Sequence, residues 1–92
     1  MAITLTQLRS FLAVLETGSV TGAAEELYVT QPSVSAAVSA LSKELGVELT
    51  NRIGRSVEPT AAGEVFAPYA AHVIGLLDQG ARAANEAAGA AA

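Results

Sequence analysis

The chain has 92 residues and contains no cysteine, no tryptophan and one histidine, His72. Without cysteine, disulfides and thiolate metal sites are excluded. His72 has no spaced pair of carboxylates to complete a metal site, so we expect it on the surface of a helix or partly buried there. The sequence therefore predicts neither a metal nor a cofactor.

Catalytic arrangements are missing as well. No serine stands in a G-x-S-x-G setting, and no histidine lies near a serine in the sequence to activate it. The glycines form no phosphate-binding loop. We therefore expect no enzyme activity.

Long apolar runs and a targeting signal are absent too. No uninterrupted apolar segment approaches the ~20 residues that span a bilayer. The first residues, MAITLTQ, lack the basic run and apolar stretch of a signal peptide. We therefore expect a cytoplasmic protein.

Large apolar side chains are scarce for a chain that is 51% hydrophobic, because 20 of its residues are alanine. A chain of this length allows one domain with a small core. The core must come from Leu, Val, Ile and the four aromatic residues. A helical fold that relies on a partner subunit is favoured over a self-sufficient globule.

The stretch from Val20 to Val38, VTGAAEELYVTQPSVSAAV, has the pattern of two short helices that cross at a tight turn. Ala23 and Ala24 let the two backbones approach, and the larger apolar residues fill a shared core. Thr30 is a suitable N-cap for the second helix, and proline is tolerated in its first turn. Such a helix-turn-helix presents the start of its second helix to the DNA major groove, so we expect the chain to read DNA.

Capping residues and helical spacing predict the bounds of three helices. Thr4 starts the first helix and Gly18 ends it. The second helix runs from about 20 to 28, and the third from about 31 to 45, where Gly46 stops it.

A hairpin and a long helix complete the predicted order. Residues 49–52 and 57–59 flank a turn of glycine and polar residues, which is typical of two paired strands. From Thr60 the helical pattern resumes. We therefore divide the chain into a DNA-binding unit, 1–59, and a linker and dimerisation helix, 60–92.

Six short motifs occur in order: QLRSF at 7–11, ETGSVTGAAEEL at 16–27, TQPSVS at 30–35, LGVEL at 45–49, R-x-x-R at 52–55 and T-x-x-G at 60–63. Over about residues 3–74 the chain resembles the N-terminal domain of LysR-type transcriptional regulators. The resemblance implies a mainly α, winged helix-turn-helix fold, in which three helices and a β-hairpin wing precede a long dimerisation helix. It also implies transcription regulation by a homodimer on double-stranded operator DNA. The recognition helix, about 31–45, would enter the major groove and the wing would lie near the minor groove.

Three residues depart from the pattern of that family. Thr50 stands where phenylalanine is usual, and Pro59 where leucine is usual. Ser42 replaces the usual glutamate. The first two fall around the wing, so its packing is where this chain is expected to differ.

The first turns of the recognition helix carry the residues expected to contact DNA. The Gln31 amide can bond adenine, and the Pro32 ring can contact a thymine methyl. The hydroxyls of Ser33 and Ser35 reach base edges or phosphates. Thr30, which precedes the helix, is also expected to contact DNA. Alternatively, Thr30, Gln31 and Ser33 are ordinary capping residues, although capping and DNA contact are compatible.

The family resemblance implies that four of the five basic residues gather on one face, toward DNA: Arg9, Lys43, Arg52 and Arg55. Arg52 and Arg55 flank the turn of the wing, where at least one can reach the DNA backbone or a narrow minor groove. The alternative is a solvated hairpin tip, charged to discourage edge pairing. Arg9 is similar to the phosphate-contacting arginine of the family, and its alternative is a surface pair with a nearby glutamate.

A stripe of apolar residues marks the long helix. Its members are Phe66, Tyr69, Val73, Leu76 and Leu77. A lone helix cannot bury this stripe against so small a domain, so we expect a homodimer interface. The alternative is that the helix folds back on its own core.

From Ala81 to the end, eight of 12 residues are alanine, and Gly80 and Gly89 interrupt the segment. We expect a frayed end or a hinge. In the resembled family a ligand-sensing domain follows. A small-molecule effector would act only through that C-terminal domain, which is absent from this chain.

The charge balance favours a competing hypothesis. The net charge is −4, the wrong sign for attraction to phosphates. Ala36 and Ala37 stand where long side chains would strengthen base reading, and they offer only apolar contact. The competitor is a helical dimerisation or scaffold module without useful DNA affinity. Local charge decides within about one Debye length, ~8 Å, so a positive face on an acidic domain keeps DNA binding as the leading hypothesis.

Overall fold

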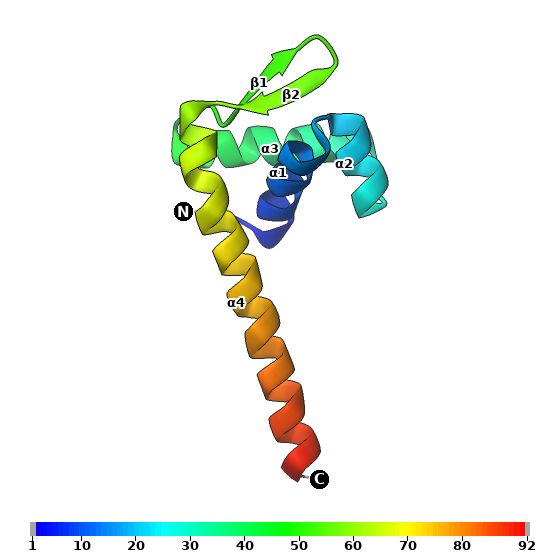
Figure 1. Ribbon diagram of the computed structural model, residues 1–92, viewed down its shortest axis with the longest axis vertical. Coiled ribbons are helices and arrows are strands. Elements are labelled where there is room, and N and C mark those ends of the chain that lie inside the picture. The colour runs from blue at the N-terminus through cyan, green and yellow to red at the C-terminus, as the bar shows by residue number, and fades with distance from the viewer. Residues whose placement is uncertain (1, 92) are drawn as a thin grey trace.

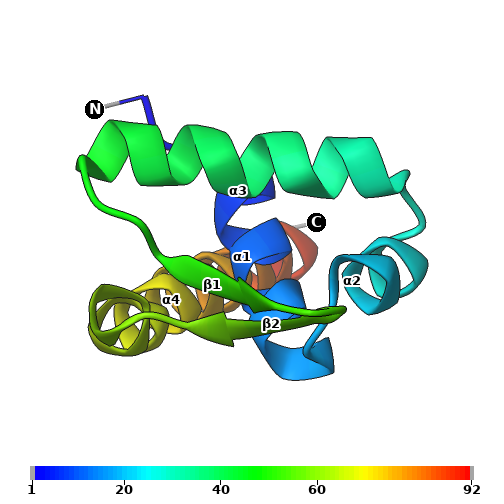
Figure 2. The ribbon, with the colours of Figure 1, turned by 90° about the horizontal axis from the view of Figure 1, so that it is seen from above.

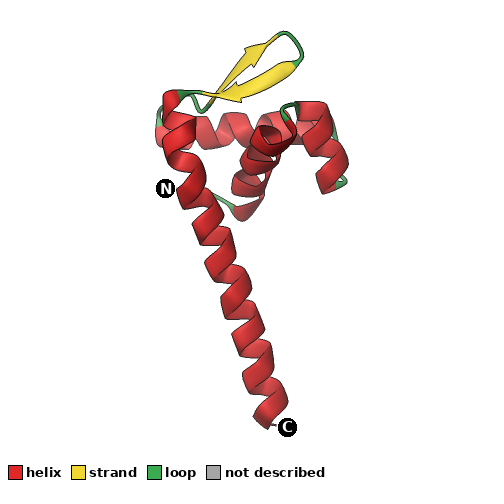
Figure 3. Cartoon of the chain, in the orientation of Figure 1, coloured by secondary structure: helices red, strands yellow, loops and turns green. Residues whose placement is uncertain are grey.

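The computed structural model describes residues 2–91, which form four helices and one antiparallel hairpin (Figure 1). The elements are α1 (Leu5–Thr17), α2 (Val20–Leu27), α3 (Gln31–Leu45), β1 (Thr50–Ile53), β2 (Ser56–Pro59) and α4 (Ala61–Ala91). Helices α1, α2 and α3 form a small body with the hairpin at one end, and α4 extends from it as an arm (Figure 3). The mainly α, winged helix-turn-helix fold is confirmed. Within residues 2–91, no helix has both the length and the apolar character needed to cross a membrane.

Local capping residues set the bounds of the first three helices, as predicted. The Thr4 hydroxyl accepts the N–H of the third residue of α1, whose side chain accepts the Thr4 N–H in return. Ser19 and Thr30 are the N-caps of α2 and α3. Gly18 and Gly46 end α1 and α3.

The turn between α2 and α3 contains a residue in an uncommon conformation. Tyr28 has a φ of 57°, in the left-handed region that few non-glycine residues adopt. Its N–H donates to the Glu25 carbonyl, and the Val29 N–H donates to the Ala24 carbonyl. Helix α2 therefore ends at Leu27, one residue earlier than predicted.

Two groups of buried side chains hold the body together. The first joins α1, α2, α3 and β2: Ala13, Val14, Ala23, Ala24, Val34 and Val57. The second joins α1, α3, the loop before β1 and α4: Leu8, Phe11, Leu41, Leu49 and Ala70. Ala23 is fully buried, and its small side chain permits the close approach of α2 that the sequence predicts.

Helix α4 packs on the body with its first half. Ala70 is buried and Ile74 packs against the second group of core residues. The Phe66 ring lies 5.9 Å from the Phe11 ring, measured between centroids. The expectation that Phe66 has no partner within the monomer is therefore wrong, because α1 places Phe11 beside it.

The alanine-rich tail is helical as far as Ala91. The expectation of a frayed end or a hinge is therefore wrong. Alanine has the highest helix propensity, which offsets the roughly 1 kcal/mol that each of Gly80 and Gly89 costs in a helix. Residues 76–90 are all exposed. This half of the arm therefore adds no buried side chain to the body.

The wing is anchored to the body by β2. The strands pair in a register that places Arg52 opposite Val57. The Val57 side chain is buried, and its N–H donates to the Gly18 carbonyl over 2.8 Å. Gly54 begins the two-residue turn with a φ of 61°, which glycine adopts without strain. Strand β1 begins and ends one residue later than predicted, and β2 begins one residue earlier.

The three departures from the family pattern meet where the wing joins the body. Ser42 is buried, and its hydroxyl accepts the Leu49 N–H over 3.4 Å. Thr50 and Pro59 pair at the base of the hairpin, and both are half-buried. The three departures therefore lie together at one joint, and a difference in its packing from the rest of the family stays a prediction.

The T-x-x-G motif fixes the start of α4 to the same joint. The Thr60 hydroxyl donates to the Glu48 carbonyl over 2.7 Å and accepts the Gly63 N–H over 3.0 Å. The Thr60 N–H donates to the Leu49 carbonyl over 3.0 Å. A Cβ at Gly63 would overlap that carbonyl oxygen, so only glycine permits this approach. The motif therefore fixes how α4 leaves the wing.

Candidate nucleic-acid interface

The first turns of α3 expose the side chains predicted to contact DNA: Gln31, Pro32, Ser33, Ser35 and Ala36. Val34 lies between them in the sequence and is fully buried in the body. Helix α3 runs along one edge of the body, with the wing beside it (Figure 2). The structure therefore brings the predicted base-reading residues together on an accessible face.

Capping and contact are compatible at the start of α3. The Thr30 hydroxyl accepts the Ser33 N–H over 3.2 Å and donates to the Ser33 hydroxyl oxygen over 2.9 Å. Because that oxygen accepts a hydrogen bond, the Ser33 proton remains available for a phosphate or base acceptor. Thr30 is a capping residue, and it orients the hydroxyl of its neighbour.

Lys43 lies apart from these residues. It is exposed in the last turn of α3, about 18 Å along the helix axis from Gln31. Its positive charge there also complements the negative end of the helix dipole. Of the two alanines that follow the readers, Ala36 is exposed and Ala37 is half-buried, so Ala36 is the more accessible to DNA.

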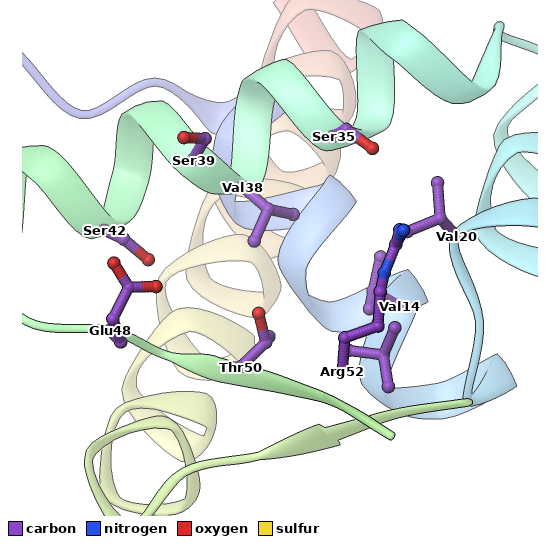
Figure 4. Close-up of a pocket in the computed structure, with 10 residues that line it drawn as sticks. Val14, Val20, Ser35, Val38, Ser39, Ser42, Glu48, Thr50 and Arg52 are labelled. Atoms are coloured by element: carbon purple, nitrogen blue, oxygen red, sulfur yellow. The ribbon is translucent and has the colours of Figure 1, made fainter. Parts of the chain in front are cut away.

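The two wing arginines occupy different positions. Residues directly opposite in an antiparallel pair share one face. Arg52 pairs with Val57, which is buried against the body, so Arg52 lies on the inner face of the wing. Its guanidinium reaches toward Val20 and Ser35 (Figure 4). Arg55 belongs to the exposed turn at the tip.

A pocket of about 190 Å³ lies between α3 and the inner face of the wing (Figure 4). The hydroxyl-bearing residues Ser35, Ser39 and Ser42 line it from α3. Glu48 lies beside Ser42, while Arg52 reaches toward Ser35. The sequence-based reasoning missed Ser39 and Glu48, because only the folded hairpin brings these residues to one pocket.

Arg9 faces α4 instead of this pocket. Its guanidinium lies 3.8 Å from the Asp78 carboxylate, and the two side chains are 46% and 58% exposed. Glu16 and Glu26 lie around the same surface. So exposed a pair contributes little to stability, typically below about 1 kcal/mol. The surface partner of Arg9 is an aspartate of α4 and not the nearby glutamate of the alternative, and phosphate contact by Arg9 stays a prediction.

Four residues of the predicted dimer interface are strongly exposed: Tyr69 by 69%, Val73 by 49%, Leu76 by 53% and Leu77 by 48%. We call these four residues the α4 apolar face. An apolar pocket of about 530 Å³, lined in part by Val47 and Val65, adjoins Tyr69 on one side. A second of about 310 Å³, lined in part by Leu5, adjoins it on the other side. Phe66 lines both pockets, although it packs on its own core.

His72 is exposed beside Pro68 and Tyr69. Among the residues that the structure describes, no three His, Cys, Asp or Glu side chains are grouped to hold a metal ion.

The chain matches the family model described as "Bacterial regulatory helix-turn-helix protein, lysR family" over residues 5–64. It is similar to an uncharacterized HTH-type transcriptional regulator in the ibpB-leuC intergenic region of Azotobacter vinelandii. The identity is 43% over 81 residues, which cover 88% of this chain and 56% of the relative. The HTH-type transcriptional activator CmpR of Synechocystis sp. is 43% identical over 76 residues, which cover 83% of this chain and 25% of the relative. The chain thus spans about half of the first relative and a quarter of the second.

Two solved structures have the same fold. The crystal structure of a CbnR_DBD–DNA complex superposes with a TM-score of 0.87 at 36% identity, covering 92% of this chain and 98% of that chain. A BenM_DBD/benA site 1 DNA complex superposes with a TM-score of 0.84 at 36% identity, covering 90% and 96%. Together with the family match over more than half of its length, this shows that the chain belongs to the LysR family of bacterial regulatory helix-turn-helix proteins.

Proposed function

We propose that this domain binds double-stranded operator DNA and regulates transcription, with the start of α3 in the major groove and the wing near the minor groove. The observation that carries the proposal is the exposed polar start of α3 beside a wing with two exposed arginines. The likeness to two domains solved with DNA supports it. Acting on bacterial DNA places the protein in the cytoplasm.

Base reading is assigned to the first turns of α3. We assign the exposed Gln31 amide to pairing with adenine, and the Ser33 hydroxyl has a proton to donate. Ser35 lies one turn from Gln31, on the side of the wing pocket. These contacts specify the sequence, whereas arginine contacts to phosphate position the protein.

The domain acts as a homodimer through the α4 apolar face. These four side chains leave large apolar areas uncovered, whereas Phe66 and Ile74 on the same helix pack against the body. Covering them with a second copy stabilises the dimer by about 25 cal/mol for each Å² buried. A small-molecule effector acts through a C-terminal domain of the kind that the family resemblance implies, and we assign it no site on this domain.

Titration with a short duplex at low and moderate salt tests the proposal. Bound DNA releases counterions, so affinity should fall steeply as salt rises. The competing function is a dimerisation or scaffold module, which the net charge of −4 favours. Dimers that bind no duplex even at low salt would support that competitor.

A further inference from the structure

If the domain binds DNA as proposed above, the pocket between α3 and the wing lies against the DNA backbone. The major and minor grooves of a duplex are separated by one sugar-phosphate strand. If α3 enters the major groove and the wing follows the adjacent minor groove, that strand must cross the space between them. The pocket of about 190 Å³ occupies this space.

The pocket has a positive side chain at one end and a negative side chain at the other. Arg52 supplies a guanidinium near Ser35, toward the base-reading end of α3 (Figure 4). Glu48 supplies a carboxylate at the other end, beside Ser42. Within the described residues the ion pair found is Arg9 with Asp78, so Arg52 and Glu48 do not neutralise each other by direct contact.

We propose that this pocket seats the sugar-phosphate strand between the two grooves, that Arg52 holds one phosphate there, and that Glu48 opposes the binding of that strand. Both side chains are exposed, so they meet an approaching phosphate without a rearrangement of the core. Salt largely screens the repulsion between Glu48 and a phosphate beyond about one Debye length, ~8 Å at physiological salt, so a phosphate in the pocket lies close enough to be repelled. Glu48 thus limits the affinity of the domain for the same strand that Arg52 binds.

The register of the wing provides a matched control. Thr50, Arg52 and Val57 line the pocket from the inner face. Glu58 pairs with Asn51 on the opposite face, so its carboxylate points away from the pocket. Glu58→Gln therefore removes an equal charge from the wing without changing the pocket, whereas Glu48 lies in the loop before β1.

The first measurement is the affinity of the 92-residue protein for a duplex recovered by selection from random sequences. Glu48→Gln should tighten binding about fivefold at physiological salt, from the loss of roughly one exposed charge repulsion. Glu58→Gln should change it less than about twofold, since its charge is farther from the strand. Arg52→Gln should weaken binding about tenfold and lower the salt slope by about one. Circular dichroism of each variant checks that the fold is kept.

The second measurement locates the phosphate. Single phosphates of the duplex are replaced, one at a time, by neutral methylphosphonates. Where the replaced phosphate is the one that Arg52 holds, the wild type should lose affinity and Arg52→Gln should lose nothing further. Where it is the phosphate of the same strand beside Glu48, the gain from Glu48→Gln should disappear. A role of either residue in folding alone would not couple to one phosphate.

The outcomes separate the two proposals. If the wild type binds no duplex at low salt, the proposed function fails. If it binds, and Glu48→Gln gains no more than Glu58→Gln, the seat in the pocket is wrong. Coupling of Arg52 and Glu48 to phosphates on different strands would overturn it as well.

Discussion

Gln31 is the single residue with the sharpest consequence for sequence reading. Its exposed amide at the start of α3 is suited to two hydrogen bonds with one adenine. Gln31→Ala should weaken specific binding by ~1–3 kcal/mol and relax the preference at one base position in each half-site. Fluorescence anisotropy with operator duplexes that carry each base at each position measures both effects.

Arg55→Ala serves as the contrasting variant. Arg55 lies in the exposed turn at the wing tip, where we expect its guanidinium to meet phosphates or the floor of the minor groove. Its loss should weaken all sequences alike and reduce the salt dependence. The same sequence-independent loss in Gln31→Ala and Arg55→Ala would show that base reading and backbone holding are not divided between α3 and the wing.

Gly63 is the residue on which the joint between wing and α4 depends. Gly63→Ala should destabilise the fold by about 1–3 kcal/mol, because the new methyl group meets the Leu49 carbonyl oxygen. Gly75→Ala is the control in the same helix, where a Cβ meets open space and should stabilise by roughly 0.5–1 kcal/mol. Thermal unfolding at equal protein concentration compares them. A Gly63→Ala variant as stable as Gly75→Ala would refute the close approach.

At the scale of elements, the ends of the helices are well predicted because they depend on neighbours in the sequence. Thr4 and Thr30 bond to residues three positions later, and Gly46 ends α3 through bonds to its own last turn. The motifs that resemble the LysR family extend this success to the wing and to the start of α4. The hairpin is displaced by only one residue, since its turn is marked by glycine.

Local sequence patterns do not predict how elements that are distant in the sequence pack against each other. Phe66 and Tyr69 have the same helical spacing in the sequence, yet Phe66 packs on Phe11 and Tyr69 is exposed. The direction of α4 determines which of the two side chains faces the core. Hydrogen bonds from Thr60 to the loop before β1 fix that direction. Glu48 lines the α3–wing pocket because the folded chain brings the loop before β1 beside α3. No spacing in the sequence indicates this contact.

The α4 apolar face carries the prediction at this scale. Val73→Glu combined with Leu76→Glu should give monomers that bind a full operator poorly, because two buried charges would oppose a dimer interface. The control double variant, Ala71→Glu with Gln79→Glu, adds the same charges to exposed positions of α4 outside that face. Analytical ultracentrifugation measures the outcome. Dimers that persist in the first variant would show that the interface is misassigned.

At the scale of the whole molecule, the shape separates two tasks. The molecule measures 54 × 26 × 19 Å, and the long dimension follows the α4 arm. The body and wing carry the proposed DNA contacts, while the arm carries the α4 apolar face. The net charge of −4 then matters less than its distribution, since Arg52 and Arg55 lie beside an uncharged start of α3. Screening over ~8 Å lets such a local face act on an acidic domain.

This distribution predicts weak and incomplete sequence reading by the domain alone. Each half-site meets three polar readers, Gln31, Ser33 and Ser35, and the exposed alanine that follows adds only a methyl contact. Glu48 lowers the affinity further if it opposes the backbone strand. A two-fold dimer should therefore select a pseudo-palindrome whose half-sites lie about one helical turn, ~34 Å, apart or a multiple of it.

Binding selection on randomised duplexes measures this selectivity. We expect an interrupted dyad in which only a few outer bases are strongly preferred, because central bases contribute through DNA deformability and not through direct contact. Glu48→Gln should recover the same bases at higher affinity, since phosphate contacts carry no direct sequence information. A long, sharply defined consensus selected by the 92-residue domain alone would mean that side chains beyond the start of α3 read bases, and it would contradict the weak-reader prediction.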